Sequence, residues 1–257
     1  MTYSWNPGEA AANDDETLDW LSPDGMAILQ KKNGFRFGTD ALVLARFTLA
    51  HLRRGNGRKP VTHLTDLGTG TGILPLLIAR DTQIARLTGI EIQPHVSQMA
   101  SRSVRGNGLE DRITIHTGDL CEATLRLGRG TQDLVISNPP YQPLGAAIRS
   151  RHHAVDAARH EVHCTLKDVV TQAAGLLRPG GAFCIIHKPE RLTELFLLLA
   201  STGLEPKQLQ FLHSRPGGAP SLLLVRALRG GRRGLHVLPP LFEQEASLEE
   251  TANGHTD

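Results

Sequence analysis

The stretch SNPPYQP, residues 137–143, combines residue types that can hold an amino group. It follows the apolar run DLVI (133–136), which predicts a strand. Proline cannot donate a hydrogen bond to a β-ladder, and it restricts the residue before it to extended backbone. The strand must therefore end here, and the chain beyond it is stiff. The Asn138 side-chain oxygen and the Pro139 carbonyl can each accept one N–H of a planar amine, and the Tyr141 ring can stack on a base. Holding both hydrogens partly localises the nitrogen lone pair, which prepares an exocyclic or amide nitrogen for attack on an electrophile.

A second stretch, DLGTGTG (66–72), ends one apolar run and opens a helical segment. Its glycines follow G-x-G-x-G, whereas the dinucleotide fingerprint G-x-G-x-x-G would need glycine where Ile73 stands. The acid at its start, Asp66, would also lie badly beside a pyrophosphate. A carboxylate next to a loop of backbone N–H groups suits a ligand with an amino-acid head group and no phosphates, and S-adenosylmethionine fits that description.

Two further acids end the next two predicted strands. Glu91 follows GI at the end of the second strand, where a carboxylate can accept both hydroxyls of a ribose. Asp119 follows Gly118 at the end of the third strand and can accept from an adenine amino group. The carboxyl ends of parallel strands meet at one edge of an open α/β sheet, so we expect the three acids to share a single ligand site.

The elements that must position these residues alternate between strand and helix. This alternation predicts a doubly wound, Rossmann-like α/β fold with a seven-stranded, mainly parallel sheet and a C-terminal antiparallel hairpin. The predicted strands are 61–68, 87–92, 112–120, 133–137, 182–186, 207–214 and 221–228, with RPGG (178–181) as a break before the fifth. The predicted helices begin at Thr39 or Asp40, at Ile73, near Pro94, at Leu166 and at Arg191.

Charge divides the chain into three parts. Residues 1–20 and 243–257 contain five acids each and no Lys or Arg, so the 26 acids fall to 16 against all 28 bases in residues 21–242, a net charge of +12. We therefore expect one domain over 21–242 between two acidic, disordered tails. The basic domain favours a polyanion such as RNA as a partner, with solubility as the plainer explanation.

Two arginine groups are candidates for gripping phosphate. Arg149 and Arg151 follow the NPPY stretch, and a second group lies beside the last predicted strand. The second group consists of Arg226, Arg229, Arg232 and Arg233.

Several classes of protein and site are not supported. The three cysteines show no C-x-x-C spacing, and no signal-peptide or membrane-spanning pattern is present, so we expect a reducing cytoplasmic location, no membrane and no metal. The stretch RHEVH (159–163) is not H-E-x-x-H, and we favour a structural or pocket-edge role for it over metal binding.

In this order and at these spacings, DLGTGTG, GIEI, GDL and NPPY resemble a class I S-adenosylmethionine-dependent methyltransferase acting on an exocyclic or amide nitrogen. The resemblance narrows, over roughly residues 15–242, to the bacterial family that methylates N6 of adenosine 37 in a valine tRNA. The stretches that narrow it are GFRFGTDALVLA, RHEVHCTLKDVV, LRPGGAF and GGRRGLHVLPPL.

The resemblance implies a tRNA partner and a set of site residues. It assigns the target amine to Asn138, Pro139 and Tyr141. The residues implied for S-adenosylmethionine are Thr39, Asp40, Asp66, Gly68, Thr69, Gly70, Gly72, Glu91, Ile92, Asp119, Leu120 and Asn138.

Three alternative functions stay open at this point. A glutamine N5-methyltransferase of release factors or other proteins also needs an NPPY stretch, although residues 1–60 leave little room for the separate helical domain of the release-factor enzymes. Methylation of guanine N2 in rRNA is a second alternative. The third, a non-catalytic RNA-binding subunit with a vestigial fold, is disfavoured by the intact Asn138–Tyr141 stretch and the unbroken glycine loop.

Overall fold

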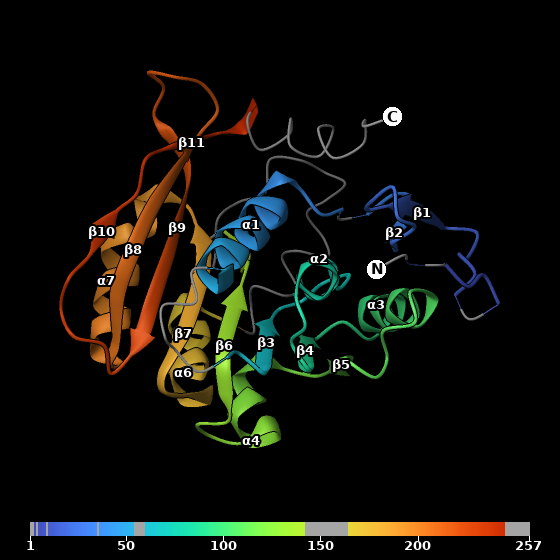
Figure 1. Cartoon of the computed structure of the whole chain (residues 1–257), viewed down its shortest axis with the longest axis horizontal. Coiled ribbons are helices and arrows are strands. Elements are labelled where there is room, and N and C mark those ends of the chain that lie inside the picture. Colours follow the sequence, from blue (N-terminus) through green and yellow to red (C-terminus); the bar gives the residue numbers. More distant parts are fainter. Residues whose placement is uncertain are drawn as a thin grey trace.

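The computed structural model describes residues 3, 5–8, 10–34, 36–53, 60–141 and 164–244. Within them, nine strands form one sheet in the order β10-β8-β9-β7-β6-β3-β4-β5, with β11 also on β8 (Figure 1). The strands are β3 (His63–Leu67), β4 (Arg86–Glu91), β5 (Ile113–Thr117), β6 (Gln132–Ser137), β7 (Leu177–His187), β8 (Leu204–His213), β9 (Pro220–Arg229), β10 (His236–Val237) and β11 (Leu241–Phe242).

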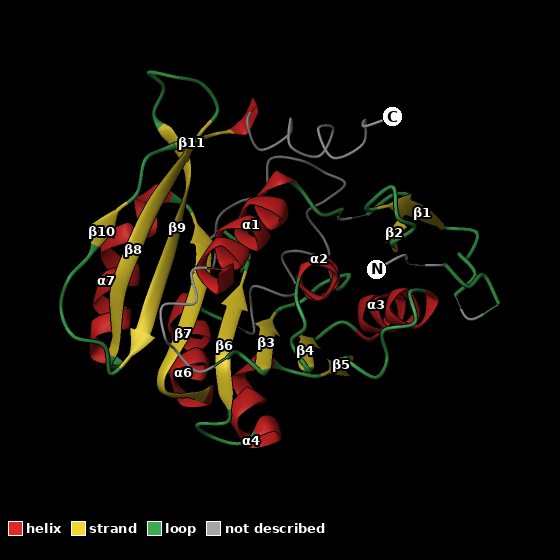
Figure 2. Cartoon of the chain, viewed as in Figure 1, coloured by secondary structure: helices red, strands yellow, loops and turns green. Residues whose placement is uncertain are grey.

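The helices cover both faces of this sheet (Figure 2). On one face, residues of α1, α2 and α3 pack in one apolar cluster, and on the other face α4, α6 and α7 contribute to a second. The helices are α1 (Thr39–Arg53), α2 (Ile73–Asp81), α3 (Pro94–Gly106), α4 (Ala123–Leu127), α6 (Leu166–Leu176) and α7 (Leu192–Ser201), with the short 3₁₀ turns η1 (Leu120–Glu122) and η2 (Pro189–Arg191). This two-sided cover confirms the predicted doubly wound fold.

The alternation of side chains along the central strands explains the two clusters. In β6, Leu134 and Ile136 face the α1–α2 side, whereas Val135 between them faces the α6–α7 side. All three are fully buried, as expected for a strand covered on both faces. Strands β3, β4, β5, β6 and β7 are parallel to their neighbours within this group, and β8 and β9 form the predicted antiparallel hairpin.

Two details of the sheet differ from the sequence prediction. RPGG (178–181) does not precede β7 but lies within it, where the register against β6 shifts between the pairs Gln132–Leu177 and Leu134–Ala182. Gly180, with φ of +79°, permits this bulge, and a bulge accommodates a proline in a strand. The sheet also extends beyond seven strands because β10 and β11, each two residues long, pair with the outer edge of β8.

Part of the segment 1–20, expected to be a disordered tail, has regular structure among the described residues. Strand β1 (Glu16–Trp20) pairs antiparallel with β2 (Ala27–Lys31), and β2 packs on α3 through a hydrogen bond from the Leu29 N–H to Ser103 Oγ of 2.9 Å. Three of the five acids of this region pair with bases elsewhere in the chain, which composition cannot show. The ion pairs are Asp15–Lys31, Glu16–Arg102 and Asp19–Arg36.

Residues before β1 also pack on the domain. The Trp5 ring lies so close to Gly106 at the end of α3 that a Cβ there would come within 2.6 Å of it. The Asn6 N–H donates to the Gly106 carbonyl at 2.9 Å, and Ala10 is buried. Among the helices of the described residues, none is both long and apolar enough to span a bilayer.

Candidate active site

The carboxyl ends of four parallel strands meet at one edge of the sheet. In register, Asp66 of β3 lies beside Gly89 of β4 and Ile136 of β6. The Ser137 hydroxyl donates to the Leu67 carbonyl at 2.8 Å and so fastens the end of β6 to the end of β3. The stretch that begins at Asn138 is thereby held next to the glycine loop.

The glycine loop turns tightly at this edge. Gly68, Gly70 and Gly72 have φ of 76°, 56° and 83°, a left-handed conformation that other residues rarely adopt. A Cβ built on Gly70 would meet nothing within 4 Å, so the backbone there faces open space. The N–H groups of Gly68 and Thr69 donate to the Ile90 carbonyl at 3.0 and 2.9 Å, which fixes the loop against β4.

Asp66 is the most unusual group of the site. Its side chain is fully buried, and neither carboxylate oxygen has a hydrogen-bond partner among the described residues; the same holds for the buried Thr69 hydroxyl. Burial raises the pKa of Asp66 to about 7, and the nearby Glu91 carboxylate adds to this rise, while the proximity of Thr69 opposes it. A buried carboxylate without partners is costly, so this acid is prepared for a cationic or N–H-bearing ligand.

Glu91 and Asp119 are oriented by backbone N–H groups. The Glu91 Oε2 accepts from Gly70 at 3.0 Å and its Oε1 from Gln93 at 2.9 Å. Asp119 caps η1 by accepting from the Cys121 N–H at 2.8 Å. These bonds set the directions of both carboxylates, whose oxygens are acceptors that suit hydroxyl or amino groups of a ligand.

Asn138, Tyr141 and Asp40 form a hydrogen-bonded cluster beside the glycine loop. Asp40, in the first turn of α1, accepts at Oδ2 from Asn138 Nδ2 at 3.0 Å and from the Tyr141 hydroxyl at 2.9 Å. The Tyr141 hydroxyl also lies 2.7 Å from Asn138 Oδ1. Because a carboxylate only accepts, Asp40 sets the Asn138 amide with its nitrogen toward α1 and its oxygen away from it.

The Tyr141 ring is enclosed by residues that the sequence analysis missed. His187, at the end of β7, meets it edge-on with ring centroids 5.6 Å apart, and Lys188 Nζ lies 5.3 Å from its centroid. Burial and, next, Arg191 lower the pKa of His187 to about 4, so its imidazole is neutral at neutral pH. Burial and the Asp40 carboxylate raise the pKa of Tyr141, which keeps its hydroxyl a donor. Both residues directly follow a predicted strand. The argument that grouped Asp66 with other residues at the carboxyl ends of strands would therefore have found them.

The structure brings most of the predicted residues together, with some exceptions. Pro139 is buried after Asn138, and Leu120 lies near Gly68, 3.9 Å from the position of a Cβ there. Ile92 is half-buried after β4, whereas Thr39 is exposed at the start of α1. Arg149, Arg151 and the RHEVH stretch (159–163) lie outside the described residues.

The second arginine group does not border this site. Arg226 is buried in β9, where its Nε donates to Gln208 at 2.8 Å. Because β9 runs antiparallel to β7, its end at Arg229 lies beside the start of β7, at the opposite edge of the sheet. Exposed Arg232 and Arg233 follow it there. Exposed Arg215, in the turn between β8 and β9, lies instead at the edge that carries the strand ends.

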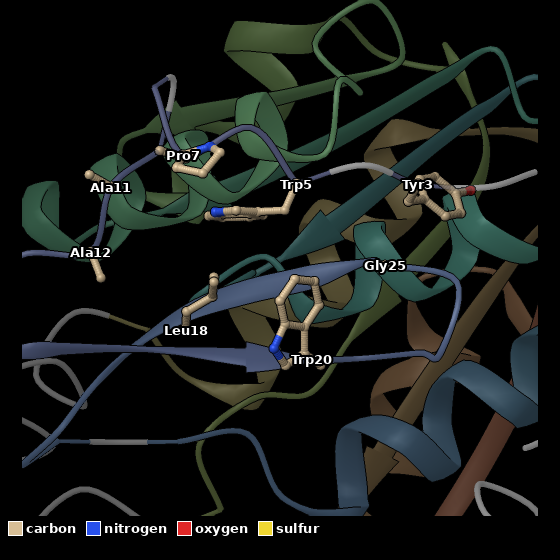
Figure 3. Close-up of a pocket in the computed structure, with 9 residues that line it drawn as sticks. Tyr3, Trp5, Pro7, Ala11, Ala12, Leu18, Trp20 and Gly25 are labelled. Carbon is tan, nitrogen blue, oxygen red and sulfur yellow. The ribbon is translucent and has the colours of Figure 1, made fainter.

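An apolar hollow of about 550 Å³ lies away from the strand ends, between the N-terminal residues and the β1–β2 hairpin. Trp5 and Trp20 line it, and Figure 3 shows them projecting from separate segments of the N-terminal region. None of the predicted site residues lines it. We therefore assign the chemistry to the edge where the strands end.

Comparisons with known proteins agree with this fold and site. A family model described as a methyltransferase small domain matches residues 45–199, more than half of the chain. A predicted O-methyltransferase from Agrobacterium tumefaciens has a similar structure, with a TM-score of 0.60 at 22% identity over 79% of this chain and 86% of that one. A geranyl diphosphate C-methyltransferase from Streptomyces coelicolor A3(2) gives 0.54 at 15% identity, covering 73% and 77%. The chain is a class I methyltransferase, an enzyme that uses S-adenosylmethionine, as the sequence predicted.

Relatives define the family more narrowly. A tRNA1(Val) (adenine(37)-N6)-methyltransferase of Porphyromonas gingivalis is 32% identical over 199 residues, 74% of this chain and 72% of the relative. One of the same name from Phocaeicola vulgatus is 30% identical, covering 77% of this chain and 79% of the relative. The chain belongs to the family of tRNA1(Val) (adenine(37)-N6)-methyltransferases.

Proposed function

We propose that this enzyme transfers a methyl group to N6 of adenine 37 in a valine tRNA, in the cytoplasm. The observation that carries the proposal is the Asn138 amide, whose orientation Asp40 and Tyr141 fix at the end of β6 beside the glycine loop. The relatives' names supply the nucleotide and the RNA.

The acids and the glycine loop fit S-adenosylmethionine. When bound, this cofactor supplies a methyl group made electrophilic by a sulfonium. Asp66 and Thr69 offer buried oxygens without partners among the described residues, which suit the ammonium of its head group, and the open backbone at Gly70 allows close approach. Glu91 and Asp119 would accept from its ribose and adenine. A site with this many carboxylates complements a ligand of net positive charge.

The cluster at the end of β6 suits a planar amine. Asn138 Oδ1 lies 2.7 Å from the Tyr141 hydroxyl and keeps a second lone pair for one N–H of the substrate. The Pro139 carbonyl would accept the other, and its direction is set by the two adjacent prolines. These two acceptors would orient the amine and stabilise the positive charge that grows on its nitrogen. Tyr141 would contact the unstacked base through the part of its ring that His187 and Lys188 leave open.

The proposal is tested by the identity of the methylated product. Incubated with labelled S-adenosylmethionine and, separately, tRNA, rRNA and release factor, the enzyme should label tRNA alone. Nucleoside analysis should then give N6-methyladenosine, and mapping should locate it at position 37. Label on release factor would support the alternative of a glutamine N5-methyltransferase. N2-methylguanosine in rRNA would support the alternative of an rRNA guanine N2-methyltransferase. RNA binding without label in any substrate would indicate a non-catalytic subunit.

RNA affinity should depend steeply on salt if the basic domain binds the tRNA backbone. With six or more phosphate contacts, we expect the affinity to fall by roughly 10³-fold or more between about 50 and 200 mM salt. Arg215→Ala, at the edge of the sheet that carries the site, should weaken binding and reduce the salt slope by about 1. Arg232→Ala, which removes an equal charge from the opposite edge, is the control. A slope near zero, or equal effects of the two variants, would contradict binding of RNA over the strand ends.

A further inference from the structure

Two thiols and a carboxylate lie together on the α6 face of the domain. The Sγ atoms of Cys121 and Cys164 and a carboxylate oxygen of Asp168 all lie within 4.8 Å of one another, and each residue is half-buried. Cys121 belongs to η1, whereas Cys164 precedes α6 and Asp168 lies in its first turn. The two cysteines are far apart in the sequence, so no sequence motif predicts that they lie together.

The backbone of Cys121 is held on both sides. Its N–H donates to Asp119 at 2.8 Å, and its carbonyl accepts from Gln172 Nε2 of α6 at 2.5 Å. The same Gln172 accepts, through Oε1, from the Thr124 N–H of α4 at 2.9 Å. One side chain of α6 thus fastens the segment that carries Cys121 to the helix that carries Asp168, so the ligand atoms are positioned in advance.

Asp168 is fixed by the N-terminal capping of α6. Its Oδ2 accepts from the Thr165 N–H at 2.8 Å and from the Thr165 hydroxyl at 2.6 Å, and the Thr165 hydroxyl in turn accepts from the Asp168 N–H. This reciprocal capping box sets the carboxylate direction and engages Oδ2. The Oδ1 atom is therefore the oxygen suited to a ligand that approaches the two thiols.

We propose that Cys121, Cys164 and Asp168 bind a thiophilic divalent cation, Zn²⁺, which joins η1 to the start of α6. Two thiolates and a carboxylate form a borderline-soft set that suits Zn²⁺ in a tetrahedral site, with water in the fourth position. Ligands about 2.0–2.3 Å from a tetrahedral centre lie within about 4 Å of each other, so three atoms within 4.8 Å of one another would need to draw together only slightly around one ion. This site departs from the expectation of no metal, which came from the cysteine spacing and from the RHEVH stretch.

The alternative use of the two cysteines is a reversible disulfide. A disulfide would join only Cys121 and Cys164 and would give no part to Asp168, although a carboxylate oxygen of Asp168 lies with the two Sγ atoms. A bound Zn²⁺ stabilises the thiolates and displaces their protons. Because the Cys121 N–H donates a hydrogen bond to Asp119, the ion would also help to fix the Asp119 carboxylate in the cofactor site.

Cobalt titration tests this site, because Co²⁺ substitutes for Zn²⁺ and is coloured. The purified full chain, kept under a phosphine reductant, should bind one Co²⁺ with sulfur-to-cobalt charge-transfer bands and the intense d–d bands of tetrahedral coordination. Zn²⁺ should bleach these bands and raise the melting temperature. Absence of the thiolate bands in the reduced wild-type chain, or a Cys121–Cys164 disulfide in a chain that takes up no Co²⁺, would overturn the proposal.

Matched variants assign the ligands. Cys121→Ser and Cys164→Ser should each lose the charge-transfer intensity of one thiolate and the stabilisation by Zn²⁺. Cys184→Ala removes the remaining cysteine, buried in β7, and should keep both. Asp168→Asn, which removes the charge of the ligand, should weaken Co²⁺ binding more than Thr165→Ala, which breaks the same capping box but keeps the carboxylate. Retention of the full cobalt spectrum in both serine variants would also overturn the site.

Discussion

Replacing Asn138 with alanine should reduce methyl transfer by roughly 10²–10³-fold or more while S-adenosylmethionine affinity changes little. The reason is that the variant loses the acceptor that orients the amine but keeps the acids and the glycine loop. Single-turnover rates with tRNA and equilibrium binding of the cofactor separate the two effects. A variant that transfers methyl groups at nearly the wild-type rate would contradict the role of Asn138.

The contact with Asp40 allows a sharper control. Asn138→Asp keeps an acceptor oxygen, but it would put a second carboxylate within about 3 Å of Asp40 Oδ2, where Asn138 Nδ2 now donates. We therefore expect this variant to be slow as well. The exchange of both residues, Asp40→Asn with Asn138→Asp, restores one donor and one acceptor and should recover part of the lost rate. If the exchanged enzyme is no faster than the slower single variant, Asp40 does not act by orienting residue 138.

Much of the sheet follows from local patterns in the sequence. Apolar runs such as DLVI (133–136) alternate with helical segments, and DLVI is buried on both faces in the structure. The acids at the strand ends could be grouped because parallel topology brings the carboxyl ends of neighbouring strands to one edge. Asp66, Glu91 and Asp119 do end successive parallel neighbours β3, β4 and β5.

What could not be predicted depends on contacts between distant segments. The bond between Asp40 and Asn138 joins residues 98 positions apart, and neither residue marks the other in the sequence. Strand β1 was counted with the expected tail because its acids find bases on other elements, as Glu16 does with Arg102 of α3. The cluster of Cys121 and Cys164 was missed for the same reason. By contrast, His187 and Lys188 could have been predicted, because they directly follow a predicted strand.

Replacing Asp66 with asparagine should stabilise the cofactor-free enzyme above pH 7 and weaken its binding of S-adenosylmethionine. The folded chain raises the pKa of Asp66 from its ordinary 3.8 to about 7, so the folded state retains a proton that the unfolded state has lost between these values. Stability of the wild type therefore declines as pH rises from about 4 to about 7, by up to about 4 kcal/mol, and levels off above. Asparagine carries no such charge, so the melting temperature of the variant should exceed that of the wild type at pH 8 and match it near pH 4.

S-adenosylmethionine, in contrast, should bind more tightly to the wild type than to the variant. The ammonium of its head group would favour the ionised form of Asp66, so binding near pH 7 should release up to about half a proton from Asp66 in the wild type and none at that position in Asp66→Asn. Calorimetry in buffers of different ionisation enthalpy measures this release, and we expect the affinity of the variant to fall roughly 10- to 100-fold.

Asp133→Asn is the matched control, because it makes the same change at a buried acid at the opposite edge of the sheet. Burial alone would raise the pKa of Asp133, but bonds from Thr62 and His63 and the charge of Arg178 outweigh it and lower the pKa. Asp133→Asn should thus destabilise the chain at pH 8 and leave cofactor affinity unchanged. Equal cofactor affinity of Asp66→Asn and the wild type would mean that the buried carboxylate serves something other than this ligand. The two substitutions should thus change stability at pH 8 in opposite directions. The reason is that the described residues donate hydrogen bonds to the Asp133 carboxylate and none to the Asp66 carboxylate.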